Sequence, residues 1–191
     1  MGLPINKLIV ATNQNDILHR AISKGSYEAE KVSETISPSM DIQIASNFER
    51  LIFDLNNEDD KQTLLDMKNI KENGKYLIGD DKLNKIRENF LSASLNENET
   101  LDVIKKVYEK FSVVLDPHTA IGVGAAQKLS LNNCVVLSTA HPCKFPDAIN
   151  NAINKQERLP KELQHVLDKK EDFQLIKNNS EEVKNFIRDK V

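Results

Sequence analysis

The stretch Val135-Val136-Leu137-Ser138-Thr139-Ala140-His141-Pro142 joins a short apolar run to a hydroxyl and an imidazole. The apolar part predicts a buried strand over residues 133–137. Ligands of open α/β sheets bind at the carboxyl ends of the strands, so a hydroxyl and a histidine that follow such a strand are placed for ligand binding. The Thr139 hydroxyl could donate to a ligand heteroatom, or it could bond nearby backbone, as Ser and Thr often do.

A second motif, Asp116-Pro117-His118-Thr119-Ala120, opens a segment that is rich in small residues. We expect a helix that Thr119 caps and that continues through these small residues. Gly122 and Gly124 would each cost about 1 kcal/mol relative to Ala in a helix. Two such glycines indicate close packing against a sheet, a ligand or the core. The segment is not a dinucleotide-binding fingerprint, because Gln127 stands where the third glycine would fall.

The N-terminal part predicts another strand, over residues 7–11, followed by a polar turn over residues 12–16. This turn again lies at the carboxyl end of a strand, where a ligand could bind, although Asn and Asp also form Asx turns. Asp16 could cap a short helix over residues 17–23, which Gly25 would end.

A third polar motif consists of Ser37-Pro38-Ser39-Met40-Asp41-Ile42 and Ser46-Asn47-Phe48-Glu49-Arg50. Its hydroxyls, its amide and its guanidinium could bind a phosphate or a carboxylate, which arginine does through two parallel hydrogen bonds. The alternative is that Ser39 or Asp41 caps a helix and that Arg50 is a surface residue. The apolar spacing predicts a helix over residues 42–55.

The rest of the sequence predicts helices separated by polar loops. Residues 27–40 are expected to be a loop, and residues 83–93 are helix-like or mixed. Apolar periodicity predicts further helices over residues 61–73, 98–111, 145–154, 162–167 and 181–187. Gly74 would end the first of these helices.

The composition narrows the classes of function. The 191 residues suit one domain, with or without an appended subdomain, and an apolar content of 39% supports a core. A net charge of −3 gives no reason to expect nucleic-acid binding, which usually needs a basic patch. No apolar run approaches the ~20 residues of a membrane span, and we expect no signal peptide, so we expect a cytoplasmic protein. The scattered histidines and cysteines indicate neither a metal site nor a disulfide framework.

Taken together, six motifs resemble those of threonine synthase, a pyridoxal-phosphate (PLP) enzyme of the fold-type-II group. Any one of them is weak, but six in this order are specific, and they span nearly the whole chain. They are Met1-Gly2-Leu3-Pro4-Ile5, Ala11-Thr12-Asn13-Gln14-Asn15-Asp16, the two halves of the third polar motif, Asp116-Pro117-His118-Thr119-Ala120 and Ser138-Thr139-Ala140-His141-Pro142-Cys143-Lys144-Phe145-Pro146.

The resemblance implies a lyase of threonine biosynthesis that converts O-phospho-homoserine and water to threonine and phosphate, with PLP as the electron sink. By resemblance, Thr139 binds the cofactor, with its hydroxyl at the pyridine nitrogen. The substrate-binding candidates are Asn15, Ser39, Asn47, Arg50 and Lys144. Arg50 and Lys144 are the cations best suited to the substrate's phosphate. His118 lies in a matching motif, but the resemblance assigns it no step.

The fold expected from the pattern and the resemblance is α/β, part of a fold-type-II PLP-enzyme sheet with flanking helices and an inserted helical subdomain. Residues 1–55 would form part of the α/β catalytic domain, and residues 56–98 a helical insertion or subdomain. Residues 99–191 would return to the catalytic domain and add the C-terminal helices. Two strands are too few for a complete parallel sheet, because isolated strands leave unpaired edges, so the pattern predicts a missing partner.

The sequence departs from the family in one large respect. It has no lysine that matches the cofactor's Schiff-base lysine and no glycine-rich loop for the cofactor phosphate. The resemblance therefore implies the C-terminal portion of the enzyme, inactive without an N-terminal portion that would be its partner. It would be an expressed fragment, a split gene product or a truncated reading frame. The alternative is a non-catalytic module that keeps the fold and acts through protein contacts.

Overall fold

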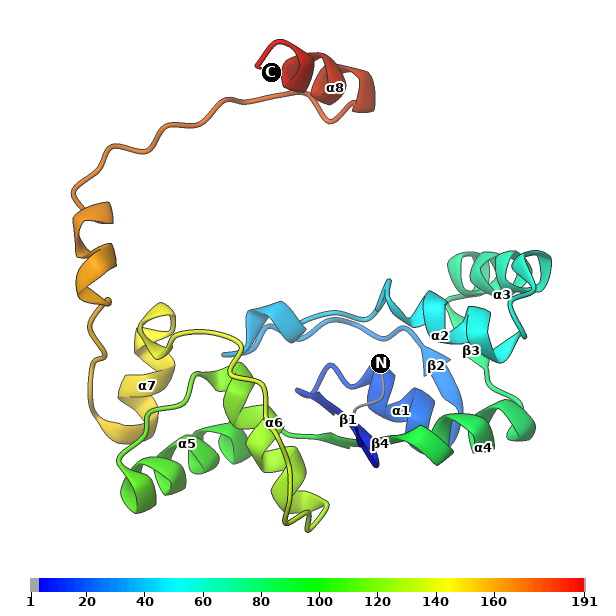
Figure 1. The fold of residues 1–191 in the computed structure, drawn as a ribbon, viewed down its shortest axis with the longest axis horizontal. Coiled ribbons are helices and arrows are strands. Elements are labelled where there is room, and N and C mark those ends of the chain that lie inside the picture. The colour runs from blue at the N-terminus through cyan, green and yellow to red at the C-terminus, as the bar shows by residue number, and fades with distance from the viewer. Residues whose placement is uncertain (1–3, 191) are drawn as a thin grey trace. The chain divides into compact units, whose positions relative to one another are not determined.

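The computed structural model describes residues 4–190, which form two compact units, residues 4–157 and residues 158–190. The first three residues of the Met1–Ile5 motif lie outside the described residues. In chain order (Figure 1), the first unit contains β1 (Leu8–Thr12), α1 (Ile17–Lys24), β2 (Ser26–Glu28), the 3-10 turn η1 (Pro38–Met40), α2 (Phe48–Leu55), α3 (Asp60–Asn73), β3 (Lys75–Leu77), α4 (Asp80–Asn89), β4 (Phe90–Ser94), α5 (Glu97–Phe111), α6 (Pro117–Lys128), the 3-10 turn η2 (Pro142–Lys144) and α7 (Pro146–Ile153). The second unit contains η3 (Lys161–Val166) and α8 (Ser180–Arg188).

Strands β1 and β4 form a parallel two-stranded sheet between two groups of helices. The register runs to Thr12 opposite Ser94, so both carboxyl ends lie at one edge. Val10 packs with the core of α1, α2 and α4, whereas Ile9 and Ala11 pack with the core of α5, α6 and α7. A strand covered on both faces explains the unbroken apolar run at this position and confirms the α/β class.

Strand β4 lies in the segment predicted as helix-like or mixed. Helix α4 ends at Asn89, and the backbone becomes extended at Phe90 (φ −117°, ψ 139°). The strand is Phe-Leu-Ser-Ala-Ser, and its serines and alanine have little intrinsic preference for a strand. What makes it a strand is its pairing with β1, which is distant in the sequence.

The predicted strand over residues 133–137 is wrong. The segment is irregular and pairs with no strand among residues 4–190. Val135 is 94% exposed and Leu137 is 75% exposed, while Val136 packs on α6 so closely that a Cβ on Gly122 would lie 2.9 Å from it. A ladder forms only where a neighbouring strand satisfies the backbone, and the described part of the chain supplies none here.

The predicted helix over residues 42–55 is correct only in its second half. Helix α2 begins at Phe48, after a turn in which the Phe48 N–H donates to the Ala45 carbonyl. Ile42 and Ile44, which the periodicity placed on the apolar face, are 42% and 65% exposed. The preceding segment instead carries Gln43, which is buried and accepts from Arg20.

Two predicted helix ends are confirmed, whereas two predicted N-caps are not. Gly25 and Gly74 end α1 and α3 with positive φ angles of 71° and 69°, as residues in the left-handed region do. Asp16 precedes α1, but its carboxylate pairs with Arg20 at 2.8 Å and caps no backbone N–H. Helix α6 begins earlier than expected, at Pro117, so its cap is the residue before that proline and not Thr119.

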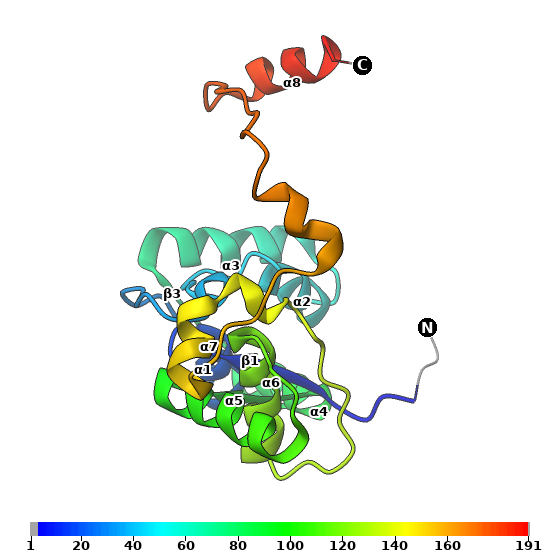
Figure 2. The same cartoon turned by 90° about the vertical axis from the view of Figure 1, so that its left-hand side faces the viewer.

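Helix α6 lies against both strands on the second face of the sheet, α5 packs on α6, and α7 packs on α5 (Figures 1 and 2). Helix α5 begins with a complete capping box, in which Asn96 and Glu99 satisfy each other's backbone N–H groups. Gly124 of α6 faces Leu95, and a Cβ added to this glycine would lie 2.2 Å from the Leu95 Cδ2 atom. The glycines of α6 are therefore explained by close packing of the helix on its neighbours.

The second unit forms the predicted C-terminal segments over residues 162–167 and 181–187 as a 3-10 turn and a short helix. None of residues 158–190 is buried. Among the described residues, no helix combines the length and the apolar character that crossing a bilayer requires. The division of the chain at residues 55 and 98 stays a prediction.

Candidate functional site

The carboxylate of Asp116 lies at the N-terminus of α6 and is 1% exposed. Its Oδ1 accepts from the backbone N–H groups of His118 (2.9 Å) and Thr119 (3.4 Å), and its Oδ2 accepts from the Thr119 hydroxyl. Pro117 takes the first helical position, where its missing N–H is not needed. An acidic cap also faces the positive end of the helix dipole. No Lys or Arg in the described residues pairs with this carboxylate, so hydrogen bonds and the helix dipole stabilise its charge.

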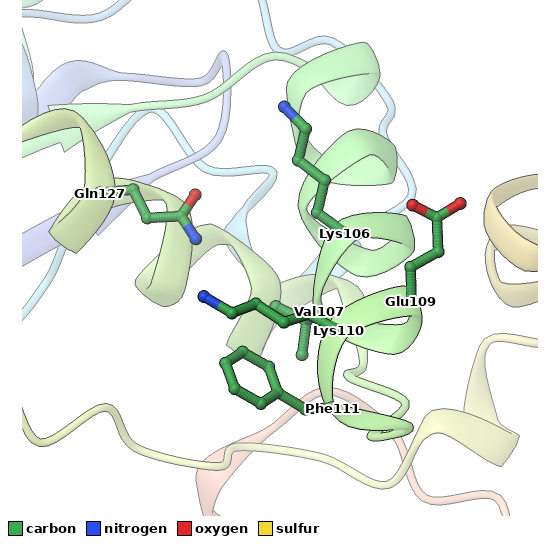
Figure 3. Close-up of a pocket in the computed structure, with 6 residues that line it drawn as sticks. All are labelled: Lys106, Val107, Glu109, Lys110, Phe111 and Gln127. Carbon is green, nitrogen blue, oxygen red and sulfur yellow. The ribbon is translucent and has the colours of Figure 1, made fainter.

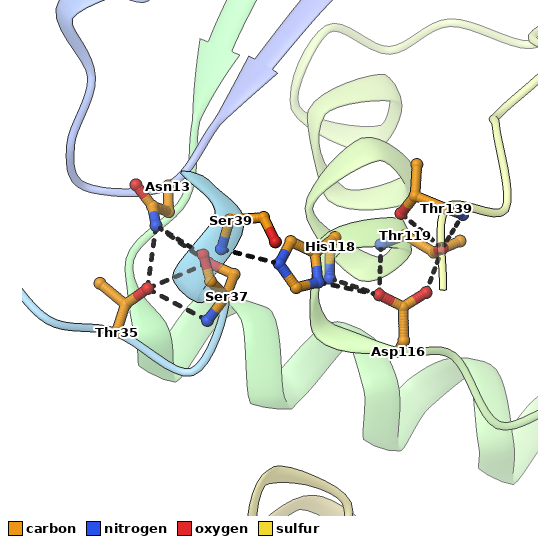
Figure 4. Close-up of polar contacts among 8 residues, drawn as sticks. All are labelled: Asn13, Thr35, Ser37, Ser39, Asp116, His118, Thr119 and Thr139. Atoms are coloured by element: carbon orange, nitrogen blue, oxygen red, sulfur yellow. Dashed lines mark hydrogen bonds and ion pairs between the residues drawn. The ribbon is translucent and has the colours of Figure 1, made fainter. Parts of the chain in front are cut away.

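His118 places its ring between this carboxylate and the turn η1. Its Nδ1 lies 3.1 Å from Asp116 Oδ1, and its Nε2 lies 3.3 Å from the backbone nitrogen of Ser39 (Figure 4). The ring is 6% exposed and packs against Phe145, with 4.9 Å between the ring centroids. Because Nε2 must accept from an N–H, the ring is neutral and its proton is on Nδ1.

Thr119 connects the same carboxylate to Thr139. The Thr119 hydroxyl accepts from the Thr139 backbone N–H at 3.1 Å, and the two hydroxyl oxygens lie 3.4 Å apart (Figure 4). The Thr119 hydroxyl hydrogen is already directed to Asp116, so in this pair only Thr139 can donate. Thr139 is exposed, and its hydroxyl is free to turn to a ligand.

A second carboxylate, Asp41, ties the turn after β1 to η1. Its Oδ1 accepts from the side-chain amides of Asn13 (2.7 Å) and Asn15 (2.9 Å), and its Oδ2 accepts from the Thr35 backbone N–H (2.8 Å). Asn13 also donates to Ser37 Oγ at 2.9 Å. We call these five residues the Asp41 cluster; it holds the backbone that leads to Ser39.

The structure brings Thr139 and Ser39 into one hydrogen-bonded network, through His118, Asp116 and Thr119 (Figure 4). Asn15 belongs to the adjoining Asp41 cluster. It is 3% exposed, and its amide also bonds both backbone groups of Ser33, at 2.9 Å each.

The other three predicted residues are not joined to this network. Asn47, Arg50 and Lys144 are exposed, and their side chains form no hydrogen bond or ion pair with other described residues. Asn47 and Arg50 lie at the start of α2, and Lys144 ends the turn η2. Their side chains are therefore available to a ligand, but protein contacts do not hold them in place.

The central role of Asp116 and the contributions of Asn13, Thr35 and Ser37 were not predicted from the sequence. One signal for Asp116 was present, because an Asp directly before a Pro is the pattern of an N-cap followed by the first helical residue. The members of the Asp41 cluster other than Thr35 lie in motifs that the sequence singled out, but their contacts join a strand end to a distant loop and have no local signal.

A hollow between the C-terminal parts of α5 and α6 contains none of these residues (Figure 3). Long side chains of α5 and one side chain of α6 form its wall, namely Lys106, Val107, Glu109, Lys110, Phe111 and Gln127. The Lys110 ammonium lies 5.1 Å from the centre of the Phe111 ring. This hollow is a gap between surface side chains, and the polar network described above is the better candidate for a site.

Comparisons with known proteins identify relatives over almost the whole chain. Residues 119–187 match the family described as "Threonine synthase, C-terminal". A threonine synthase from Pseudomonas aeruginosa is 40% identical over 98% of this chain, and one from Saccharomyces cerevisiae is 39% identical over 95%. A crystal structure of PLP-bound threonine synthase from Brucella melitensis has a TM-score of 0.88 and 42% identity over 99% of the chain. The yeast enzyme structure has a TM-score of 0.83.

The match covers only part of each relative. The chain spans 41% of the Pseudomonas protein and 41% of the Brucella structure. The resemblance predicted from the motifs is therefore confirmed: in sequence and in fold, the chain is similar to the C-terminal portion of threonine synthases.

Proposed function

We propose that this chain forms the C-terminal part of a PLP-dependent threonine synthase, a lyase of amino-acid biosynthesis. The complete enzyme would convert O-phospho-homoserine and water to threonine and phosphate. The observation that carries the proposal is the network around Asp116, which joins the two motifs that the resemblance assigns to the cofactor and to the substrate. PLP would supply the electron-withdrawing ring, and the residues of this chain would bind and orient it.

The residues present fit the pyridine side of PLP. Thr139 has an exposed hydroxyl that can donate to a ring nitrogen, and its backbone is held in place by Thr119. At the carboxyl end of β1, Thr12 Oγ1 is buried and has no hydrogen-bond partner among the described residues. An unpaired buried hydroxyl is uncommon in a folded protein and fits an edge that is completed by something else.

On the substrate side, we propose that Arg50 and Lys144 bind the phosphate, because both are exposed cations with no partner among the described residues. Ser39 and Asn47 would add a hydroxyl and an amide. Asn15 would act by fixing the loop that carries Ser39, since its own amide is already engaged.

The partner would be an N-terminal portion that carries the cofactor lysine and the phosphate loop. Support comes from the 41% coverage of the relatives and from the unpaired segment around Val135 and Leu137. An apolar segment with an unpaired backbone can accept a strand from another polypeptide. We place the enzyme in the cytoplasm, with no nucleic-acid partner.

Complementation tests the proposal directly. The purified chain is mixed with the N-terminal portion of the Pseudomonas relative that this chain does not match, together with PLP, and phosphate and threonine release from O-phospho-homoserine are measured. We expect turnover from the mixture and none from either part alone. Turnover by the chain alone would contradict the proposal that it needs an N-terminal portion. No complex and no turnover in the mixture would favour the non-catalytic module.

The variant Thr139→Val tests the assigned cofactor residue in the same mixture. It removes only the hydroxyl, so the two parts should still associate, while the cofactor's absorption band shifts and turnover falls by about tenfold, as for one lost hydrogen bond to a charged or polar group. The control is Ser23→Ala, which removes an exposed hydroxyl of α1 that donates only to the His19 carbonyl of its own helix. This control should change neither the band nor the rate. An unchanged band and rate in Thr139→Val would remove Thr139 from the site.

A further inference from the structure

One buried carboxylate fixes two segments that are far apart in the sequence. Asp116 Oδ1 lies 3.1 Å from His118 Nδ1, whose ring accepts from the Ser39 backbone N–H through Nε2. Its Oδ2 accepts from the Thr119 hydroxyl, which in turn accepts from the Thr139 backbone N–H. The three side chains that make these connections are between 1% and 6% exposed.

The direction of each hydrogen bond follows from the carboxylate. A carboxylate only accepts, so Nδ1 must carry a proton, and the Ser39 N–H only donates, so Nε2 must be bare. Only this form can accept from the Ser39 N–H. The other neutral form, or a ring protonated on both nitrogens, would present an N–H to an N–H.

We propose that Asp116 and His118 are a positioning pair, which sets the Ser39 turn and the Thr139 segment at a fixed separation. Neither residue would touch the substrate. The pair acts through the backbone N–H groups of Ser39 and Thr139. Its importance for catalysis rests on the proposed function, whereas its effect on these two segments does not.

The first test uses the chain itself. Nitrogen-15 NMR of the wild-type ring should show the form protonated on Nδ1. Asp116→Ala removes the acceptor beside Nδ1, whereas an Asn would keep an amide oxygen there for the two backbone N–H groups. In the Ala variant we expect the ring to change to the form protonated on Nε2. The Ser39 amide should then exchange with solvent at least about fivefold faster, the factor for one lost hydrogen bond.

A conservative variant separates positioning from simple packing. His118→Gln can place its side-chain oxygen where Nε2 lies and should keep most of the Ser39 protection, whereas His118→Leu fills the space and should lose it. Asp59→Ala is the matched control for Asp116→Ala. Asp59 caps α3 through two backbone N–H groups at 3.0 Å and has no histidine partner, so this variant should leave the Ser39 amide and the His118 ring unchanged.

The second test uses the complementation mixture. Loss of positioning should raise KM for O-phospho-homoserine at least about fivefold in His118→Leu, with recovery in His118→Gln. An equal Ser39 exchange rate in the Leu and Gln variants would overturn the proposal. A wild-type ring protonated on Nε2 would also overturn it, and this result holds even if His118→Leu unfolds. If the mixture never turns over, the proposed function fails, and the NMR results still decide on the positioning pair.

Discussion

Two buried polar networks in the first unit are built from similar residues but differ in how their charges are balanced. The first, the site network, consists of the Asp41 cluster with Asp116, His118 and Thr119. The second, the helical network, joins α2, α3, β3 and α4 through Asn56, Thr63, Asp66, Tyr76 and Lys82.

The helical network contains its own cation. Lys82 Nζ lies 2.5 Å from Asn56 Oδ1 and 3.8 Å from Asp66 Oδ2. In the site network, neither carboxylate pairs with a Lys or Arg among the described residues, and both ends of the network reach exposed residues, Ser39 and Thr139. Burial of polar groups alone therefore does not mark a site. The distinguishing feature is an unbalanced charge that holds exposed segments in place.

The largest expected effect comes from removing the centre of the helical network. Asp66→Ala would leave Asn56, Tyr76 and Lys82 without their shared acceptor. We expect the free energy of unfolding to fall by about 3 kcal/mol, measured by chemical denaturation. The amide signals of Ser39 and Thr139 should not move, and a shift in them would show that the two networks are coupled.

Two glycines of α6 separate stability from placement of the site. Gly124→Ala drives a methyl group into Leu95 and should lower the free energy of unfolding by about 1–2 kcal/mol, since overpacking exceeds the gain in helix propensity. Gly122→Ala meets only Val136, in an exposed segment that can move away. This variant should change stability by less than about 1 kcal/mol while shifting the Thr139 amide signal. If the two variants lowered the free energy of unfolding equally, the packing around Gly124 would not be tighter than the packing around Gly122.

Alkaline titration provides a third test, because burial, then the charge of Asp66 and the hydrogen bond to it, raises the pKa of Tyr76 to about 12. A folded-state pKa above the ordinary value of 10 means that stability is fully present below pH 10 and is lost as the pH rises toward 12. Tyr76→Phe should reduce this loss and lower stability at neutral pH by about 1 kcal/mol.

The matched control for Tyr76 is Tyr27→Phe. Burial also raises the pKa of Tyr27, but this phenol accepts from the Ala45 N–H and has no carboxylate beside it. We measure the free energy of unfolding at several pH values above 10. Tyr27→Phe should change its dependence on pH less than Tyr76→Phe does. Equal changes would show that Asp66 contributes little to the alkaline instability.

The smallest expected effect has the opposite sign. Thr12→Val removes a buried hydroxyl that lacks a partner among the described residues, so the isolated chain should become more stable, by up to about 1 kcal/mol. Thr63→Val is the comparison, because the Thr63 hydroxyl bonds Asn56 and the Asp59 carbonyl and its loss should destabilise. A destabilised Thr12→Val chain would show that the Thr12 hydroxyl is satisfied after all.

Local signals in the sequence predicted much of the fold. The strand before Thr12 and the helices ended by Gly25 and Gly74 were found because apolar periodicity and left-handed glycines act over a few residues. Strand β4 was missed because only its pairing with β1 makes it a strand, and the strand over residues 133–137 was wrong because its pattern anticipates a neighbour that the described residues lack.

The candidate site, like the fold, was only partly predictable from local signals in the sequence. Thr139 and Ser39 were predicted by resemblance to motifs, and the structure links their segments through a network. The importance of Asp116 came from its burial and its four hydrogen bonds, which depend on where α6 starts and how η1 packs. Contacts between a helix end and a distant loop have no period or spacing that a sequence could reveal.

The bare side chains of Val135 and Leu137 have a practical consequence for anyone who produces this polypeptide. At high concentration, copies of the chain would associate through this exposed segment and precipitate, because β-prone segments pair readily with identical segments. Co-expression with the complementary portion, instead of mixing after purification, should give the higher soluble yield.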